Sequence, residues 1–528
     1  MPTPATEPVL IAGRWRPADA IGTYRAFDPT RAEQRGAVWP ISSQADVDEA
    51  LDAAVAAHGE LARRPAEDLG RFLDRYAERL EARGEELVAA AHAETGLAIA
   101  PRLRDSELPR MLDTLRQAAA AAREQTWRMA MIDSRANIRA ACFGLGPVAI
   151  FPPANFPLAY GCATGGDFAA AIAAGNPVIA KAHPGHPTVS KLAAEEAVAA
   201  LHETGLPAAT VQLIHGIDNA TGERLVADPR IGATGFTGSE AAGTKLFTAA
   251  TAAGKVIWVE MGSINPVVLL PGAIAERGPQ IADELAASVT SSAGQFCTKP
   301  GLVFLVGDEA GAAFVAAVAE RFGAIGPQVL LGEAGCRRLC AGIDGLLAAG
   351  ARLVTGEAAA TGPAGHVPTL LEVSAADLLA RPSTFIVEAF GNATLLVRCG
   401  SLDELTHAVA CAKGSLGASL YASHAGVDDE AFALIAPLLV ARAGRIVENR
   451  MPTGLTVTPP MQHGGPWPSA GPPFFSAVGL PWSILRFARR VCFDGWSDRR
   501  LPAIVRDAPP PGNPWRYVDR AWTQAAVR

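Results

Sequence analysis

The sequence predicts an α/β protein with two sheet-containing parts and a projecting β-hairpin. Three observations predict this fold class. Short apolar runs rich in β-formers alternate with helical runs over residues 144–262, a second pattern of the same kind follows over 263–480, and residues 126–143 read as two short strands about a turn. At 528 residues the chain exceeds one ordinary hydrophobic core, so at least two domains are expected.

Residues 46–125 are predicted to form a helical lobe, from the spacing of their apolar residues. Apolar residues recur there at spacings of three and four, with Arg and Glu between them, as in LGRFLDRYAERLEARGEELVAAAHAETG. The next stretch, TWRMAMIDSRANIRAACFGLGP, predicts a hairpin about a DSRAN turn. Such a hairpin would present an unpaired strand edge in a monomer, and pairing with a second copy would cover it. We therefore expect a homodimer or homotetramer.

Five apolar runs after residue 146 read as the strands of one sheet. They are PVAIF, PVIAK, VQLIH, IGATGFTG and KVIWVE, each separated from the next by a helical run. Because they lack polar positions, they favour a parallel sheet covered on both faces. Right-handed crossovers would make this sheet Rossmann-like.

The composition excludes several function classes. Hydrophobic residues make up 49% and charged residues 19%, and the formal net charge of −7 is spread along the chain, so no nucleic-acid partner is expected. We find no signal peptide and no apolar run long enough to span a membrane, so we expect a cytoplasmic protein with no membrane partner. The eight cysteines then read as free thiols.

No metal site is predicted. Cys336 and Cys340 share one helix face, but no second Cys or His pair follows at a zinc-site distance. His183 and His186 lack a third ligand nearby and flank prolines, so they read as loop histidines.

Polar residues follow the ends of the predicted strands, where ligands collect in an open parallel sheet. Asn155, Lys181, Ser239 and Glu260 each occupy such a position. Three of them also have a structural alternative. Ser239 could be an ordinary helix cap rather than part of a pyrophosphate site, Asn155 could fix a turn rather than bind an oxyanion, and Glu260 could cap a turn.

A cysteine in the segment SSAGQFCTKPG has a setting unlike that of a core thiol. Cys297 lies among small and polar residues that supply backbone amides and room for a substrate, whereas a structural cysteine usually has aliphatic neighbours. The thiolate is the reactive form of cysteine. Together with Asn155 and Glu260, this setting favours a nucleophile.

These residues belong to a series of motifs that resembles the aldehyde dehydrogenase superfamily along nearly the full chain. The motifs, in order, are ANFP (154–157), AKAHP (180–184), FTGS (236–239), EMGSINP (260–266), GQFCTKPG (294–301), VEAFGN (387–392) and NRMPTG (449–454). The resemblance implies an aldehyde dehydrogenase-like fold. Its parts would be a coenzyme-binding domain (1–125 and 144–262), an oligomerisation hairpin (126–143), a catalytic domain (263–480) and a C-terminal segment (481–528), partly interface or loosely ordered.

The resemblance also implies a mechanism. Cys297 would attack the aldehyde to form a thiohemiacetal, with the oxyanion held by the Asn155 amide and the Cys297 backbone N–H. Hydride transfer would leave a thioester, which Glu260 would hydrolyse by activating water, giving a carboxylic acid.

The implied coenzyme is NADP or NAD. Lys181 would bind the adenosine ribose, Gly238 and Ser239 the pyrophosphate, and Glu388, with Phe390 beside it, the nicotinamide ribose. Many NAD-preferring relatives have a glutamate three residues after the lysine, but here that position is Pro184, so a 2′-phosphate would meet no carboxylate. The candidates for further ligands of that phosphate are His183 and Thr188.

Several motifs resemble one branch, that of α-ketoglutaric semialdehyde (2,5-dioxovalerate) dehydrogenases and NADP-dependent fatty aldehyde dehydrogenases. They include FPPANFPLAY, KAHPGHPTVS and the late HGGPWP (463–468). A short oxo-acid semialdehyde is therefore the first expected substrate and a medium or long aliphatic aldehyde the second. One rival activity is transfer of the acyl group to coenzyme A, but relatives that do this usually lack a carboxylate at the position of Glu260. Another rival is a thiol hydrolase or acyltransferase, an activity that leaves Lys181 and Glu388 unexplained.

Two more residues receive a hypothesis. Arg450 could clamp a substrate carboxylate if it lines the substrate mouth, with a surface arginine as the alternative. His463 could approach Glu260, but a loop histidine bonded to backbone is the preferred interpretation.

Overall fold

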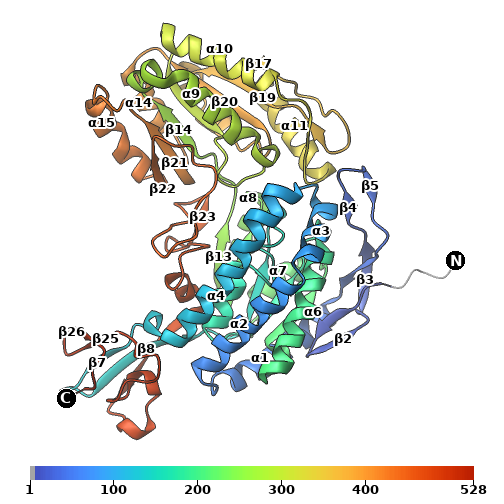
Figure 1. Cartoon of the computed structure of the whole chain (residues 1–528), viewed down its shortest axis with the longest axis vertical. Helices are drawn as coiled ribbons and strands as arrows, with labels where there is room; N and C mark the ends of the chain where they lie inside the picture. The colour runs from blue at the N-terminus through green and yellow to red at the C-terminus, as the bar shows by residue number, and fades with distance from the viewer. Residues whose placement is uncertain (1–5, 528) are drawn as a thin grey trace, which may run out of the picture.

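The computed structural model describes residues 6–527, which form two lobes and an arm (Figure 1). The first lobe is built on an eight-stranded sheet with the order β2-β1-β11-β10-β9-β12-β13-β23. Its strands are β1 (Val9–Ile11), β2 (Arg14–Arg16), β9 (Val148–Phe151), β10 (Val178–Lys181), β11 (Val211–Ile214), β12 (Ala233–Thr237), β13 (Val256–Glu260) and β23 (Ala470–Gly471). The five strands expected from the sequence are parallel neighbours, and the predicted Rossmann-like sheet is confirmed.

Helices cover both faces of this sheet because neighbouring residues of each strand point to opposite sides. In β9, Val148 and Ile150 join one core cluster, whereas Ala149 and Phe151 join another. The first cluster contains α2 (Ala66–Ala82), α3 (Gly84–Thr95), α4 (Leu108–Glu124), α5 (Gly166–Ala173) and α6 (Pro187–Thr204), and the second contains α1 (Gln44–Leu61), α7 (Asn219–Ala227) and α8 (Glu240–Ala252). The strand order reverses between β9 and β12, and ligands of open α/β sheets bind at the carboxyl ends of the strands at such a point.

The second lobe repeats this plan. Its seven-stranded sheet has the order β17-β19-β20-β15-β14-β21-β22, and all pairs except that of β17 with β19 are parallel. Its strands are β14 (Pro266–Leu269), β15 (Leu302–Val306), β17 (Arg352–Thr355), β19 (Thr369–Ser374), β20 (Ala393–Cys399), β21 (Ser415–Tyr421) and β22 (Ala443–Glu448). One face carries α9 (Pro271–Thr290) and α10 (Glu309–Gly323), and the other α11 (Glu333–Ala348), α12 (Ala375–Ala380), α14 (Leu402–Ala410) and α15 (Asp429–Val440).

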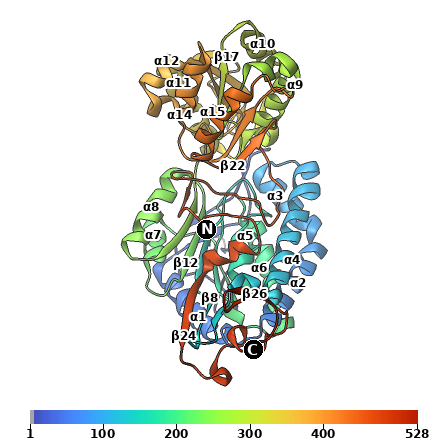
Figure 2. The same ribbon diagram turned by 90° about the vertical axis from the view of Figure 1, so that its left-hand side faces the viewer.

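The chain crosses back from the second lobe to the first after β22. Figures 1 and 2 show the lobes stacked along the long axis, with this returning chain between them. It ends in β23, which pairs antiparallel with β13 and places Ala470 opposite Glu260. Part of the segment 263–480 therefore belongs to the first sheet.

The arm differs from the expected two-stranded hairpin. Strands β7 (Met131–Asp133) and β8 (Ile138–Gly144) form the hairpin, but β24 (Ala488–Asp494) pairs with β8 and β25 (Arg516–Val518) with β7, and β26 (Ala521–Thr523) completes a five-stranded sheet. Both edges of the hairpin are thus covered within the chain. The expected exposed edge is therefore not on the hairpin itself, since the outermost strands of this sheet are β24 and β26. The oligomeric state stays a prediction.

The C-terminal segment, expected to be partly interface or loosely ordered, supplies three strands of the arm between residues 488 and 523. The side chain of Arg516 is fully buried and donates to the carbonyls of Arg506, Asp507 and Ala525. These hydrogen bonds from one buried guanidinium hold separate parts of the C-terminal segment together. The proline-rich composition of the segment does not predict such contacts.

Candidate active site

The loop that carries Cys297 follows α9 at the base of the second lobe. Its conformation is tight, because a Cβ at Gly294 would lie 2.2 Å from the carbonyl oxygen of Gly391. The fully buried Asn265 donates to the carbonyls of Cys297 at 2.8 Å and Lys299 at 2.9 Å. The SINP motif therefore holds the cysteine loop in place.

Glu260 and His463 lie beside Cys297. The Nε2 atom of His463 is 3.4 Å from the Sγ of Cys297 and 3.2 Å from Oε1 of Glu260. Glu260 is 3% exposed and His463 2% exposed, whereas Cys297 is half-buried and reaches a cavity. The preferred interpretation of His463 as a loop histidine bonded only to backbone is wrong.

Close backbone packing brings His463 to this point. A Cβ at Gly464 would lie 2.1 Å from the carbonyl oxygen of Phe475, and one at Gly465 would lie 2.2 Å from that of Ser415. Only glycine fits at such approaches. The two glycines of HGGPWP thus let the returning chain pass close enough for His463 to contact Glu260.

The pKa of the Cys297 thiol is raised well above its ordinary value by burial and by the neighbouring carboxylate of Glu260. At neutral pH the thiol is therefore protonated, and it needs a base at hand to attack as a thiolate. His463 is within reach to accept that proton.

Asn155 lies near the same loop. Its side-chain N–H donates to the carbonyl of Gln295 at 2.9 Å. An asparagine amide has two N–H donors, so one remains for an oxyanion. Within residues 6–527 the backbone N–H of Cys297 donates to no carbonyl, so the two donors expected from the sequence both have capacity for a substrate oxygen.

A buried ion pair holds the Asn155 segment. Arg102 pairs with Glu107 and also donates to the carbonyl of Asn155 at 2.8 Å. The carboxylate of Glu107 accepts from the backbone N–H groups of Leu158 at 2.8 Å and Ala159 at 3.0 Å. Both ends of this short segment are therefore fixed to the helical lobe.

The thiol faces a cavity of about 140 Å³ that lies between the lobes. Its wall carries aromatic rings and two arginines. The lining residues are Arg102, Ser106, Arg110, Phe156, Tyr160, Phe296, Cys297, Thr298, Gly454, Leu455 and His463. Arg450 is exposed and is not among them, so the structure favours the surface alternative for that residue.

Sequence reasoning missed Arg102 and Arg110. Both residues lie in RLRDSELPRML, eight positions apart, and this pair of arginines was the one feature that could have indicated a cationic site. The helical pattern predicted only that the segment belongs to the helical lobe. Helical periodicity does not report which face of a helix meets a loop from the other end of the chain.

Lys181, predicted to bind the coenzyme ribose, lies at the end of β10. Its ammonium group has no hydrogen bond or ion pair with any other residue in the range 6–527, and burial lowers its pKa to about 8. His183 lies two residues further on, and burial, the neighbouring His186 and the positive charges of Lys181 and Arg338 keep the pKa of His183 well below its usual value. Arg338 comes from α11 of the second lobe, so it adds a cation that the sequence could not place.

The remaining predicted coenzyme residues lie near the ends of β12 and β13. Ser239 caps α8 by accepting from the N–H of Ala242, which leaves the exposed first turn of that helix available to a pyrophosphate. The N–H of Gly238 donates to the carbonyl of Glu260. Glu388 accepts from the N–H of Ser263 at 3.1 Å, and Phe390 is half-buried on the same segment. These residues fit a dinucleotide better than any metal cofactor.

One metal-ligand arrangement is nevertheless present among residues 6–527. The ligand atoms of Glu260, Cys297 and His463 all lie within 4.8 Å of one another.

Among residues 6–527, none of the helices combines the length and the apolar character that a membrane span requires.

Comparison with known proteins identifies the family. The model of the aldehyde dehydrogenase family matches residues 15–469. The chain belongs to the aldehyde dehydrogenase family. Curated relatives include α-ketoglutaric semialdehyde dehydrogenase 2 of Azospirillum brasilense, 38% identical over 95% of this chain and 97% of the relative. Another is the α-ketoglutaric semialdehyde dehydrogenase of Acinetobacter baylyi, 32% identical over 95% of this chain and 96% of the relative.

Solved structures agree on the fold of this aldehyde dehydrogenase. An aldehyde dehydrogenase of Pseudomonas syringae in complex with NAD+ and octanal is similar, with a TM-score of 0.76 at 24% identity. The match covers 94% of this chain and 98% of the other. An NADP-dependent glyceraldehyde-3-phosphate dehydrogenase of Bacillus halodurans in complex with NADP has a TM-score of 0.76 at 21% identity, over 93% of this chain and 99% of the other. The enzyme is an NAD(P)-dependent aldehyde dehydrogenase, and its coenzyme is NAD or NADP.

Proposed function

We propose that this aldehyde dehydrogenase converts a short oxo-acid semialdehyde, such as α-ketoglutaric semialdehyde, into the dicarboxylic acid. The observation that carries the reaction is the convergence of Cys297, His463 and Glu260 beside one cavity. The observation that supports the substrate is the charge of that cavity, because Arg110 in its lining has no carboxylate partner within residues 6–527, whereas Arg102 is paired with Glu107. The two relatives with the α-ketoglutaric semialdehyde name point the same way.

The residues act in the following roles. The Sγ of Cys297 attacks the aldehyde carbon as its proton passes to Nε2 of His463, which lies 3.4 Å away. The free N–H of Asn155 and the backbone N–H of Cys297 hold the developing oxyanion. Bound nicotinamide coenzyme supplies the hydride acceptor.

Glu260 and His463 then serve the hydrolysis of the cysteine thioester. The Glu260 carboxylate takes a proton from water, directly or through His463 at 3.2 Å, so that hydroxide attacks the acyl carbon. The acid leaves and the thiol of Cys297 is restored. This role for Glu260 separates the proposal from transfer of the acyl group to coenzyme A.

Lys181 would bind the adenosine ribose, Gly238 and Ser239 the pyrophosphate, and Glu388 with Phe390 the nicotinamide ribose. We also propose a homodimer or homotetramer in the cytoplasm. The eight cysteines are all free thiols, which suits a reducing compartment.

A medium or long aliphatic aldehyde is the second candidate. The rings of Phe156 and Phe296, 5.6 Å apart in the cavity wall, favour it because they would contact an alkyl chain. The charge of the same wall opposes it.

A panel of aldehydes assayed with each coenzyme tests the proposal through the absorbance of NAD(P)H. We expect the highest kcat/KM for an oxo-acid semialdehyde, no product with Cys297→Ala, and a single burst without turnover with Glu260→Gln. Asn155→Ala should lower kcat by about 10² to 10³. Normal turnover by Cys297→Ala would refute the mechanism, and a preference for neutral aldehydes would refute the substrate.

A further inference from the structure

We propose that Arg110 and Tyr160 form the subsite that recognises the far end of the substrate, with Arg110 binding its carboxylate and the Tyr160 hydroxyl donating to the adjacent oxo group. This inference rests on the proposed function, because it assumes an oxo-acid semialdehyde whose aldehyde end meets Cys297. It replaces the earlier hypothesis for Arg450, which is exposed.

Arg110 is a half-buried cation without a counter-ion. Over residues 6–527 it makes no ion pair with a carboxylate, and its one side-chain hydrogen bond goes from Nη2 to the carbonyl of Leu455 at 2.9 Å. Arg102, in the same wall, is different because Glu107 neutralises it. Since a guanidinium has five N–H donors, Arg110 keeps an edge available to an incoming carboxylate.

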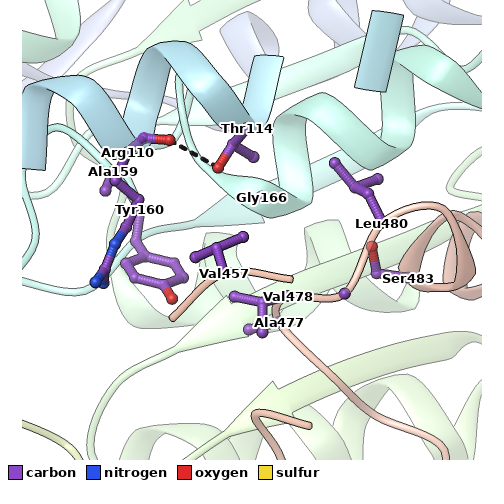
Figure 3. A pocket seen from close by; sticks show the side chains of 11 residues that line it. Arg110, Thr114, Ala159, Tyr160, Gly166, Val457, Ala477, Val478, Leu480 and Ser483 are labelled. Carbon is purple, nitrogen blue, oxygen red and sulfur yellow. Dashed lines mark hydrogen bonds between the residues drawn. The ribbon is translucent and has the colours of Figure 1, made fainter. Parts of the chain in front are cut away.

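Tyr160 brings an unused hydrogen-bond donor to the same place. Its hydroxyl is buried, and within residues 6–527 it has no hydrogen-bond partner. A buried hydroxyl without a partner costs free energy, which a ligand that accepts the hydrogen bond would recover. Figure 3 shows the side chains of Arg110 and Tyr160 side by side, turned the same way.

Both residues face the cavity that holds the thiol. Arg110 and Tyr160 line that cavity together with Cys297, and they also line the smaller neighbouring pocket drawn in Figure 3. The ring of Tyr160 lies 6.3 Å from that of His463, so Tyr160 stands next to the reacting groups. A substrate that fills the cavity can therefore contact the thiol and both recognition residues.

The ligand that matches these groups has a carboxylate next to an acceptor oxygen. A 2-oxo acid offers both, since its carboxylate can take two parallel hydrogen bonds from a guanidinium and its ketone oxygen can accept from a phenol. A neutral aliphatic aldehyde would satisfy neither group. The subsite thus selects against substrates that only fill the apolar wall.

The role of Arg110 is tested with two aldehydes of equal chain length, glutaric semialdehyde and pentanal. Arg110→Met should lower kcat/KM for glutaric semialdehyde by about 10- to 100-fold and leave pentanal nearly unchanged, because a hydrogen-bonded charge is lost only for the anion. Arg450→Met is the matched control and should change neither value. An equal loss of kcat/KM for both aldehydes would show that Arg110 only anchors Leu455. Unchanged kcat/KM values for both would also overturn the role.

The role of Tyr160 is tested with a second pair, α-ketoglutaric semialdehyde and glutaric semialdehyde, which differ only in the oxo group. Tyr160→Phe should lower kcat/KM by about 3- to 10-fold for the first and leave the second unchanged. Equal effects on both aldehydes would refute contact with the oxo group.

Binding measured without turnover separates this inference from the proposed function. Glutarate should inhibit pentanal oxidation by the wild-type enzyme competitively, and glutaramide should not. Arg110→Met should weaken glutarate inhibition by at least tenfold. If the wild-type enzyme prefers neutral aldehydes yet Arg110 still sets glutarate inhibition, only the substrate proposal fails. If glutarate inhibits wild-type and variant alike, the subsite fails.

Discussion

The Nε2 atom of His463 contacts both Cys297 and Glu260, at 3.4 Å from the sulfur and 3.2 Å from the carboxylate. A single ring nitrogen either accepts a proton or donates one, so it cannot serve both neighbours in the same state. Moving one proton from the thiol to the imidazole turns Nε2 into a donor to Glu260. The imidazole is thus placed to pass the thiol proton toward the carboxylate.

This placement predicts the pH dependence of a His463→Asn variant. Burial and Glu260 raise the pKa of Cys297, so the thiolate is scarce at neutral pH and grows more abundant as the pH rises toward that pKa. Without the imidazole, kcat/KM should fall by about 10² at pH 7 and the loss should shrink steadily at higher pH.

The rate of Cys297 alkylation by iodoacetamide provides a second readout and should follow the same profile. A rate loss that is equal at all pH values would point to a structural role for His463. His407 is exposed on α14 of the second lobe, so His407→Asn is the control and should behave like the wild type.

The same three residues predict inhibition by zinc. Thiolate, imidazole and carboxylate ligand atoms within 4.8 Å of one another match the three protein ligands of an open zinc site. Micromolar Zn²⁺ should inhibit the enzyme and chelation with EDTA should restore activity, with His463→Asn weakening the inhibition. Inhibition that persists unchanged in that variant would place the zinc elsewhere.

The coenzyme site predicts how the choice between NADP and NAD changes with pH. Lys181 is charged below its pKa of about 8 and neutral above it, so its attraction for a 2′-phosphate is present at low pH and lost at high pH. The KM for NADP should therefore rise more steeply than that for NAD as the pH passes from 7 to 9. Parallel changes would contradict a contact between Lys181 and the phosphate.

Arg338 should contribute to the same preference from the other lobe. Because its charge helps to lower the pKa of His183, two residues after Lys181, we expect it to attract an adenosine 2′-phosphate bound there. Arg338→Ala should raise the KM for NADP about tenfold, equivalent to ~1.4 kcal/mol, and leave that for NAD unchanged. Arg337→Ala is the neighbouring control, and equal effects of the two changes would remove Arg338 from the site.

The arm predicts a stability effect of Arg516. Replacing it with Met would leave three carbonyls without their buried charged donor, at a cost of about 1–3 kcal/mol for each group left unsatisfied. The Tm should fall, and the uncovered edge of β7 should promote aggregation. Arg499→Met, at an exposed position, should leave both unchanged, and an unaltered Tm for Arg516→Met would show that the tail is not held by this residue.

Much of the fold and the central chemistry could be predicted from the sequence. Apolar runs fix the strands of the first sheet, because a parallel strand buried on both faces tolerates few polar residues. Their polar successors, including Asn155 and Glu260, then had to meet at one sheet edge. Cys297 stood out by its small, polar neighbours.

Contacts between distant segments were decided only by the tertiary structure. His463 reaches Cys297 across 166 positions because Gly464 and Gly465 allow backbones to pack closely, and Arg110 faces the cavity because Leu455 lies against its helix. The edges of the hairpin are covered by strands from the end of the chain. Local patterns determine which side chains lie on which face of an element, but which remote segment packs against that face depends on the summed burial of the whole chain.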